Sequence, residues 1–301
     1  MTTRRYQIEH LTRYIYPSPV SVSCQLLHVR PRVHPRQDAE SCVLQVDPPV
    51  ESPGGVQEQW DTFGNPVTRL ALETVHDHLQ VRVITRLGIR PRGALIMDGI
   101  PDWTALRDSL VYRGQPLTPG MLEACRFRVE SPHVPLKGCF ERFARPCFVP
   151  GRSVLAGAMA LMEQIYTTFT YDPEATQIAT PLTDVLRLQR GVCQDFAHLM
   201  IAGLRSLGLP ARYVSGYLLT HPPAGQPRLV GADASHAWVS VWCPVNGWVD
   251  FDPTNNVLPD QEHITLAWGR DFSDVSPLRG IILGGTAQPP DVEVTVTPLT
   301  A

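Results

Sequence analysis

Several common signals are missing from this chain. It has no apolar run of the roughly 18 residues that a membrane-spanning helix needs. No apolar secretory segment follows Met1-Thr2-Thr3-Arg4-Arg5-Tyr6. The 26 Lys and Arg residues are outnumbered by 29 Asp and Glu residues, giving a net charge of −3, so the basic surface typical of nucleic-acid or anionic-membrane binding is also missing. We therefore expect a protein that binds neither nucleic acid nor membranes.

Cysteine pairing patterns are missing too. The chain has 7 cysteines, an odd number, and no two of them form a C-x-x-C pair. His76-Asp77-His78 offers three possible metal ligands, but the alternating residues after it indicate the entry to a strand with exposed polar side chains. We expect no metal and no cofactor, and unpaired thiols favour a reducing cytoplasmic location.

Of the 301 residues, 43% are hydrophobic, which is enough for sizeable cores. The pattern of hydrophobic and polar residues changes twice along the chain. Short alternating runs broken by Pro and Gly predict a β-rich, sandwich-like domain over residues 1–100. Residues 101–150 are expected to form a linker or covering subdomain, and residues 151–270 a mixed core. In the tail, residues 271–301, the alternation of Val292, Val294 and Val296 predicts an edge strand that returns to the N-terminal sheet. The predicted fold class is α+β.

An amphipathic helix is predicted from Val192 to Leu207. Its apolar residues recur at spacings of three and four, and Gly208 and Pro210 provide a stop. Cys193 then lies in the first turn, where unpaired backbone N–H groups and the helix dipole favour a thiolate. A helix end supplies only about 0.3–1 kcal/mol of this preference, so a reactive sulfur also needs a nearby cation.

His236 is the candidate for that cation. It lies in an alternating run, residues 234–242, that predicts a strand, and a second run at 248–252 is expected to complete a hairpin. A carboxylate on the second run can orient the imidazole, as in a nucleophile–base–carboxylate triad. Asp252 is the favoured carboxylate, and Asp250 is the alternative because residues two apart in a strand share a face.

Three motifs occur in order along the chain: Gly191-Val192-Cys193-Gln194-Asp195-Phe196-Ala197, Asp233-Ala234-Ser235-His236-Ala237-Trp238-Val239 and Gly247-Trp248-Val249-Asp250-Phe251-Asp252-Pro253-Thr254-Asn255. Together they resemble the transglutaminase-like superfamily of papain-fold cysteine enzymes, and its bacterial members in particular. Residues 6–20 and 61–67 look like the β-rich region that precedes the core in those members. The resemblance implies a nucleophile helix packed on an antiparallel sheet, and implies that Cys193, His236 and Asp252 are catalytic.

Other residues near these motifs have weaker signals. Tyr171, Gln194 and Asp233 are candidates for the oxyanion site or the cleft, although Tyr171 is equally well explained as a buried aromatic plug. Asp195 is better explained as an acidic residue that interacts favourably with the positive end of the helix dipole. His198 faces another side of the helix from Cys193, which favours a core or surface role.

The expected reaction is acyl transfer at amide or peptide bonds through a thioester, with a peptide or protein as substrate. Hydrolysis and transamidation share every step up to the thioester. We expect hydrolysis, because the resemblance is to bacterial members often regarded as protease-like, and no acidic cluster suggests the calcium sites of animal transglutaminases. The alternatives are a protein-glutamine transamidase, an acetyltransferase that uses coenzyme A, and a non-catalytic scaffold. The sequence gives no indication of the oligomeric state.

Overall fold

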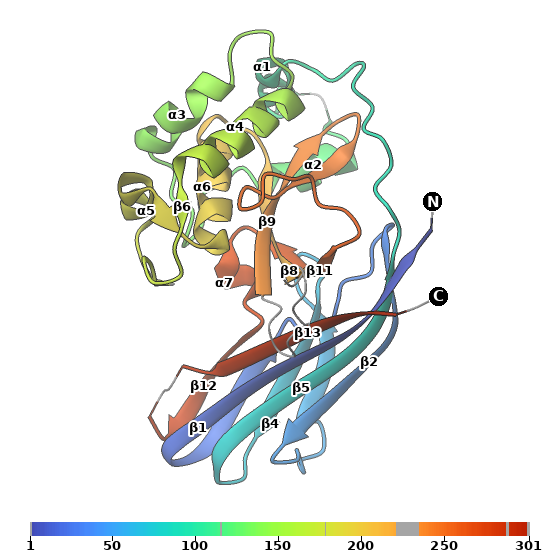
Figure 1. Ribbon diagram of the computed structural model, residues 1–301, viewed down its shortest axis with the longest axis vertical. Helices are drawn as coiled ribbons and strands as arrows, with labels where there is room; N and C mark the ends of the chain where they lie inside the picture. Colours follow the sequence, from blue (N-terminus) through green and yellow to red (C-terminus); the bar gives the residue numbers. More distant parts are fainter. Residues whose placement is uncertain (1, 115, 178, 221–234, 287–288, 300–301) are drawn as a thin grey trace, which may run out of the picture.

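The computed structural model describes residues 2–114, 116–177, 179–220, 235–286 and 289–299. Two parts lie end to end: a large β-sheet at one end, and a helical layer packed on a smaller sheet at the other (Figure 1). This arrangement confirms the predicted α+β class, with a β-rich N-terminal region before the mixed core. Within the described ranges, no helix has both the length and the apolar character needed to cross a membrane.

The larger sheet has seven strands and is built around β1 (Figure 1). The path of the sheet is β2-β5-β1-β4-β3, and β12 and β13 also pair with β1. The strands are β1 (Arg4–Leu27), β2 (Gln37–Asp47), β3 (Val56–Trp60), β4 (Pro66–Leu72), β5 (His76–Ile89), β12 (Leu278–Gly284) and β13 (Asp291–Leu299).

Strand β1 is 24 residues long and changes neighbours along its length. Its first half pairs with β5 and β13, and its second half pairs with β4 and β12. The C-terminal tail thus adds two strands to the sheet, where the sequence predicted one. The second strand was missed because β12 exposes most of its residues and begins and ends near glycines, so it lacks clear alternation.

The second part contains a four-stranded antiparallel sheet in the order β10-β9-β8-β11 and a short parallel pair, β6 and β7. Its strands are β6 (Thr170–Tyr171), β7 (Arg190–Gly191), β8 (Ala211–Leu218), β9 (Ser235–Cys243), β10 (Gly247–Phe251) and β11 (His263–Gly269). Its helices are α1 (Trp103–Ser109), α2 (Pro119–Cys125), α3 (Gly138–Ala144), the 3-10 turn η1 (Arg145–Cys147), α4 (Val154–Thr168), α5 (Leu182–Leu188), α6 (Cys193–Ser206) and α7 (Phe272–Val275).

Helix α6 is the centre of this part. One face of α6 packs on β8 and β9, and α3, α4 and α5 pack around the rest of it. Gly203 permits the contact with α3, because a Cβ at this position would lie only 2.9 Å from the Cβ of Ala144. The predicted helix and hairpin are both confirmed, as α6 and as the β9–β10 pair. Helices α1 to α3, which arise from residues 101–150, share one apolar core with α6.

A separate apolar cluster joins the two parts. Side chains from β1, β5 and β13 meet side chains from β8 and β11 and are almost completely buried: Tyr6, Ile8, Leu87, Ile89, Tyr217, Leu219, Ile264, Leu266, Val294 and Val296. Full burial of each aliphatic side chain contributes roughly 1.5–3 kcal/mol. The Tyr217 hydroxyl also lies 2.7 Å from Nδ1 of His10 across this junction. The small sheet is therefore held between the helices and the large sheet.

Candidate active site

Cys193 is the first residue of α6 and is half-buried. The turn before it is held by Asp195, whose carboxylate accepts hydrogen bonds from the Val192 N–H at 2.9 Å and from the Thr176 hydroxyl at 2.6 Å. Gly191 leaves room for this carboxylate, because a Cβ there would lie 2.6 Å from Asp195 Oδ2. Asp195 thus fixes the start of the helix and the position of the thiol.

His236 lies at the start of β9 and is 8% exposed. Its Nε2 lies 2.7 Å from Oδ2 of Asp252, and the Cys193 thiol lies near enough to the ring to act on its pKa. Because Nε2 is occupied by Asp252, Nδ1 is the nitrogen left for the sulfur. Burial acts to lower the pKa of His236, but the hydrogen bond with Asp252 and the nearby Cys193 thiol outweigh it and raise the pKa to about 10. The structure thus brings together the three residues singled out in the sequence.

Asp252 is completely buried, and five hydrogen bonds satisfy its carboxylate. Oδ1 accepts the backbone N–H groups of Thr254 at 2.9 Å and Asn255 at 3.2 Å. Oδ2 accepts His236, the Asn255 side-chain amide at 2.7 Å, and Nε2 of His263 at 3.0 Å. Burial acts to raise the pKa of Asp252, but the bonds from His236 and His263 hold it well below its usual range. The carboxylate is ionised and rigid.

His263 and Asn255 are the site residues that the sequence did not identify. Asn255 ends one of the three motifs, so its place beside the carboxylate had a local signal. His263 opens β11, in a stretch where no motif was recognised, and only the pairing of β11 with β8 brings it to Asp252. Its ring also packs edge-on against Trp238, with the ring centroids 5.3 Å apart.

The nitrogens of His236 and His263 and an oxygen of Asp252 lie within 4.8 Å of one another, a spacing compatible with metal ligands. Both rings, however, already lie at hydrogen-bond distance from the same oxygen, at 2.7 and 3.0 Å. A zinc ion placed about 2.0–2.2 Å from each ligand would have to separate them. The hydrogen bonds are therefore sufficient to account for this cluster.

The weaker candidates have different positions. The β6–β7 pair sets Tyr171 opposite Gly191, two residues before Cys193. Tyr171 is 54% exposed, which rules out the buried-plug interpretation, and partial burial together with the nearby Cys193 raises its pKa. Gln194 is half-buried and lines a cavity against the first turns of α6. Asp233 lies outside the described residues.

Three histidines mentioned in the sequence analysis are located away from the triad. His198 is buried, stacks on His133, and accepts the Phe272 N–H at 3.2 Å, and burial lowers its pKa to about 3. His78 is exposed beside Asp77, as a strand entry predicts, whereas His76 is buried against Tyr16, contrary to the expectation of exposed polar side chains.

A cavity of about 350 Å³ lies against the first turns of α6, on the side of the helix that carries His198. It is lined by residues on the loop before α3, on the approach to α5, and on the first turns of α6, among them His133, Lys137, Thr180 and Gln194.

Comparison with known proteins agrees with this geometry. Residues 141–253 match the transglutaminase-like superfamily, and residues 6–87 match the bacterial transglutaminase-like N-terminal region. An uncharacterised protein of Mycobacterium tuberculosis is 36% identical over 304 aligned residues, which cover 98% of this chain and 93% of the relative.

Two further relatives have more specific names. A protein-glutamine gamma-glutamyltransferase of Pseudomonas aeruginosa is 34% identical over 118 residues, covering 36% of this chain and 18% of that protein. A crystal structure from Cytophaga hutchinsonii, provisionally named a cysteine protease, has a TM-score of 0.75 at 20% identity and covers 100% of this chain and 92% of that one. The latter shows a shared fold. From these matches and the site, the chain belongs to the transglutaminase-like superfamily and has the N-terminal region of its bacterial members.

Proposed function

We propose that this protein catalyses acyl transfer at an amide or peptide bond, with Cys193 as nucleophile, His236 as general acid and base, and Asp252 as the orienting carboxylate. The observation that carries the proposal is the hydrogen-bonded Asp252–His236 pair, whose imidazole acts on the Cys193 thiol at the start of a helix. A histidine held in its charged form beside a thiol is the arrangement that turns a cysteine into a thiolate nucleophile.

In the first half of the reaction the Cys193 thiolate attacks the substrate carbonyl. Collapse of the tetrahedral intermediate breaks the carbon–nitrogen bond, and His236 gives its proton to the leaving amine. A thioester to Cys193 and a neutral imidazole remain. In the second half a water molecule loses its proton to His236 and attacks the thioester, which releases a carboxylic acid and restores the thiolate–imidazolium pair. Asp252 stays ionised throughout.

The negative oxygen of the intermediate needs hydrogen-bond donors. The backbone N–H of Cys193 suits this role, because the first N–H groups of a helix have no carbonyl partner within it. Tyr171 is the second candidate donor, since its side chain is exposed beside the thiol. Asp233 and Gln194 remain candidates for contacts along the cleft.

We favour hydrolysis over transamidation, because Cys193 is only half-buried and its neighbour Tyr171 is exposed, so water can reach a thioester at this position. The second candidate is transfer to a primary amine, which the partial similarity to a protein-glutamine gamma-glutamyltransferase supports. We propose a peptide or protein substrate, and a cytoplasmic location in keeping with seven cysteines that are all free thiols.

The test is to trap the thioester. The protein is incubated with a peptide library and quenched in acid, and its cysteine peptides are analysed by mass spectrometry. We expect an acyl adduct on Cys193 that the Cys193→Ala variant lacks and that a Cys24→Ala control retains, since Cys24 lies in the large sheet. Product masses with and without putrescine then separate water from amine as acceptor.

The same samples test the alternatives. Labelling of Cys193 by iodoacetamide no faster than the other cysteines, with no acyl adduct on any peptide, would favour a non-catalytic scaffold. Stabilisation of the fold by coenzyme A would favour the acetyltransferase alternative.

A further inference from the structure

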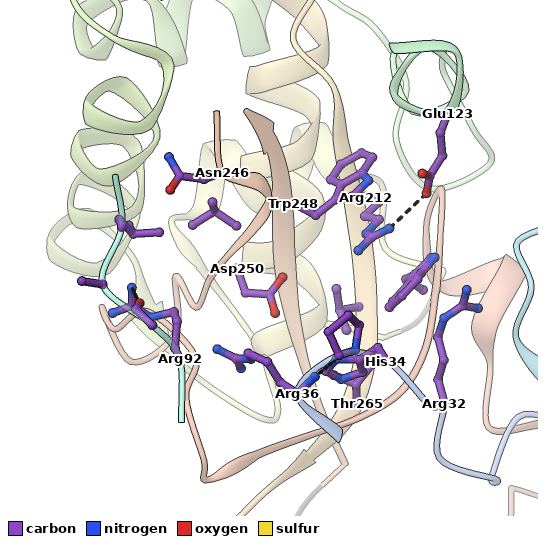
Figure 2. Close-up of a pocket in the computed structure, with 17 residues that line it drawn as sticks. Arg32, His34, Arg36, Arg92, Glu123, Arg212, Asn246, Trp248, Asp250 and Thr265 are labelled. Atoms are coloured by element: carbon purple, nitrogen blue, oxygen red, sulfur yellow. Dashed lines mark hydrogen bonds and ion pairs between the residues drawn. The ribbon is translucent and has the colours of Figure 1, made fainter. Parts of the chain in front are cut away.

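A second cavity of the protein is separate from the thiol. It has a volume of about 630 Å³ and lies where residues 32–36, residues 92–95, α2 and the small sheet meet. Figure 2 shows Arg32, Arg36, Arg92 and Arg212 reaching it from different segments of the chain, with Asp250 and Glu123 as its acidic residues. The segments that contribute the arginines belong to both parts of the molecule.

Strand alternation places this cavity on the sheet face away from α6. The ring of Tyr213 contacts His198 of α6, so the side chain of its neighbour Arg212 leaves the opposite face. In the same way Trp248 and Asp250 share one face of β10, and both line the cavity. Figure 2 shows the helices behind the strands from which these residues project.

Arg212 is held in place by aromatic rings rather than by acids. Its guanidinium carbon lies 4.2 Å from the centre of the Trp248 ring and 3.7 Å from that of Trp268. Arg32 covers the other face of Trp268 at 3.6 Å, and its Nη1 donates to Asn65 and to the Phe63 carbonyl. The two arginines and two tryptophans therefore form one rigid stack.

The charge on Arg212 is poorly compensated. Its side chain is 6% exposed, yet among the described residues Nε and Nη1 have no hydrogen-bond partner. Its ion pair is with Glu123 at 3.5 Å, on a side chain that is 45% exposed. Asp250 also faces the cavity, but within the described ranges no ion pair joins it to an arginine. Burial lowers the pKa of Arg212 to about 9, although Asp250 and Glu123 act to raise it.

The balance of charge in the lining is positive. Four arginines face two carboxylates, and His34 adds no charge near neutral pH because burial lowers its pKa to about 4. A single inorganic phosphate would fill only part of 630 Å³, which is within the range of small-molecule sites. Guanidinium groups suit phosphate and carboxylate oxygens, which they bind through two parallel hydrogen bonds.

We propose that this cavity binds a small organic anion with two or more phosphate or carboxylate groups, which the guanidiniums of Arg36, Arg92 and Arg212 would contact. A bound anion would give Arg212 a further negatively charged partner, and it would link the N-terminal segment to the small sheet. The proposal is independent of the reaction at Cys193, since it concerns the other face of the sheet.

The test uses sodium pyrophosphate and sodium citrate as probes in metal-free buffer, with sodium chloride at matched ionic strength as the reference. Calorimetric titration of the full chain is expected to show binding of at least one probe. Binding of pyrophosphate alone would assign a phosphate ligand, and binding of citrate alone a carboxylate ligand. Tryptophan fluorescence is expected to change with occupancy, because Trp248 and Trp268 flank Arg212.

Substitutions in the lining test whether the anion binds in this cavity. The double variant Arg36→Gln/Arg92→Gln removes two cavity charges from half-buried side chains and is expected to weaken binding at least about tenfold. Arg187→Gln, on a side chain 69% exposed on α5, is the matched control and is expected to bind as the wild type does. Arg212→Met tests the stacked arginine directly, and the double variant remains decisive where Arg212→Met does not fold. Absence of binding by both probes, or equal affinity in the double variant, would overturn the proposal.

Discussion

Arg212 on β8 and Asp252 at the end of β10 are both buried charges, but their surroundings differ. Asp252 is completely buried and accepts five hydrogen bonds, two of them from histidines. Arg212 is buried between two tryptophans and keeps two donor nitrogens without a hydrogen bond in the described structure. A buried charge without partners is costly.

The difference separates two kinds of site. Around Asp252 the protein itself supplies every partner, so the carboxylate and the imidazole keep one geometry with or without a substrate. This is what a preorganised reaction centre requires. Around Arg212 the hydrogen-bond partners are incomplete, so a bound anion would stabilise this charge more than it would stabilise one that is already paired. The following substitutions change the number of partners around one of these two charges.

The largest effect is expected from Asp252→Ala. It leaves His236 and His263 without their shared acceptor, and it should slow thioester formation by about 10³-fold or more. Loss of a buried charge partner should also cost about 3–5 kcal/mol in the free energy of unfolding, measured in urea. Asp250→Asn, two residues earlier in the chain, is the control, and its rate of thioester formation should stay within a few-fold of wild type. Equal losses in the two variants would remove Asp252 from the proposed triad.

The stabilisation provided by His236 is expected to depend on pH. Its pKa of about 10 in the folded protein lies above the ordinary value near 6.5, so the stabilisation is complete below about pH 6.5 and is lost as pH rises towards 10. The gap in unfolding free energy between wild type and His236→Gln should therefore shrink by roughly 2 kcal/mol or more between pH 6 and pH 10. Denaturant titrations at several pH values measure it. A gap that is constant with pH would contradict a charged His236.

A moderate effect is expected at His263, which we interpret as a positioning residue for Asp252. His263→Leu removes one hydrogen bond to a charged oxygen and should slow thioester formation about tenfold. His263→Gln keeps an N–H donor and should recover part of the rate. If the leucine and glutamine variants are equally slow, the ring acts through packing against Trp238 and not through its hydrogen bond.

The smallest effect is expected at the edge of the arginine cavity. Glu123→Gln removes a partly exposed ion pair, so the unfolding free energy should change by less than about 1 kcal/mol. The same change removes a negative charge beside Arg212 and should strengthen binding of pyrophosphate or citrate a few-fold. Calorimetry and urea unfolding on one preparation separate the two quantities. Weaker anion binding in this variant would contradict the charge argument.

Local patterns in the sequence were sufficient to predict the helix of Cys193 and the hairpin of His236, because spacing of apolar residues reports directly on which face is buried. His263 could not be found in this way, since its role depends on the pairing of β11 with β8 rather than on its neighbours in the chain. Local sequence patterns could predict the arginine cavity even less. Arg32, Arg92 and Arg212 come from three separated segments, and only the packing of the large sheet against the core makes them neighbours.

The strand at the centre of the large sheet also constrains how the chain reaches its final form. Arg5 of β1 pairs with Leu299 of β13, so the first half of β1 keeps one edge open until β13 has been synthesised. Val294 and Val296 of β13 belong to the cluster that joins the two parts, so a nascent chain cannot complete that junction early. A circular permutant that links the tail to the front of β1 and opens a surface turn elsewhere would make this pairing local, and it should fold faster at similar stability.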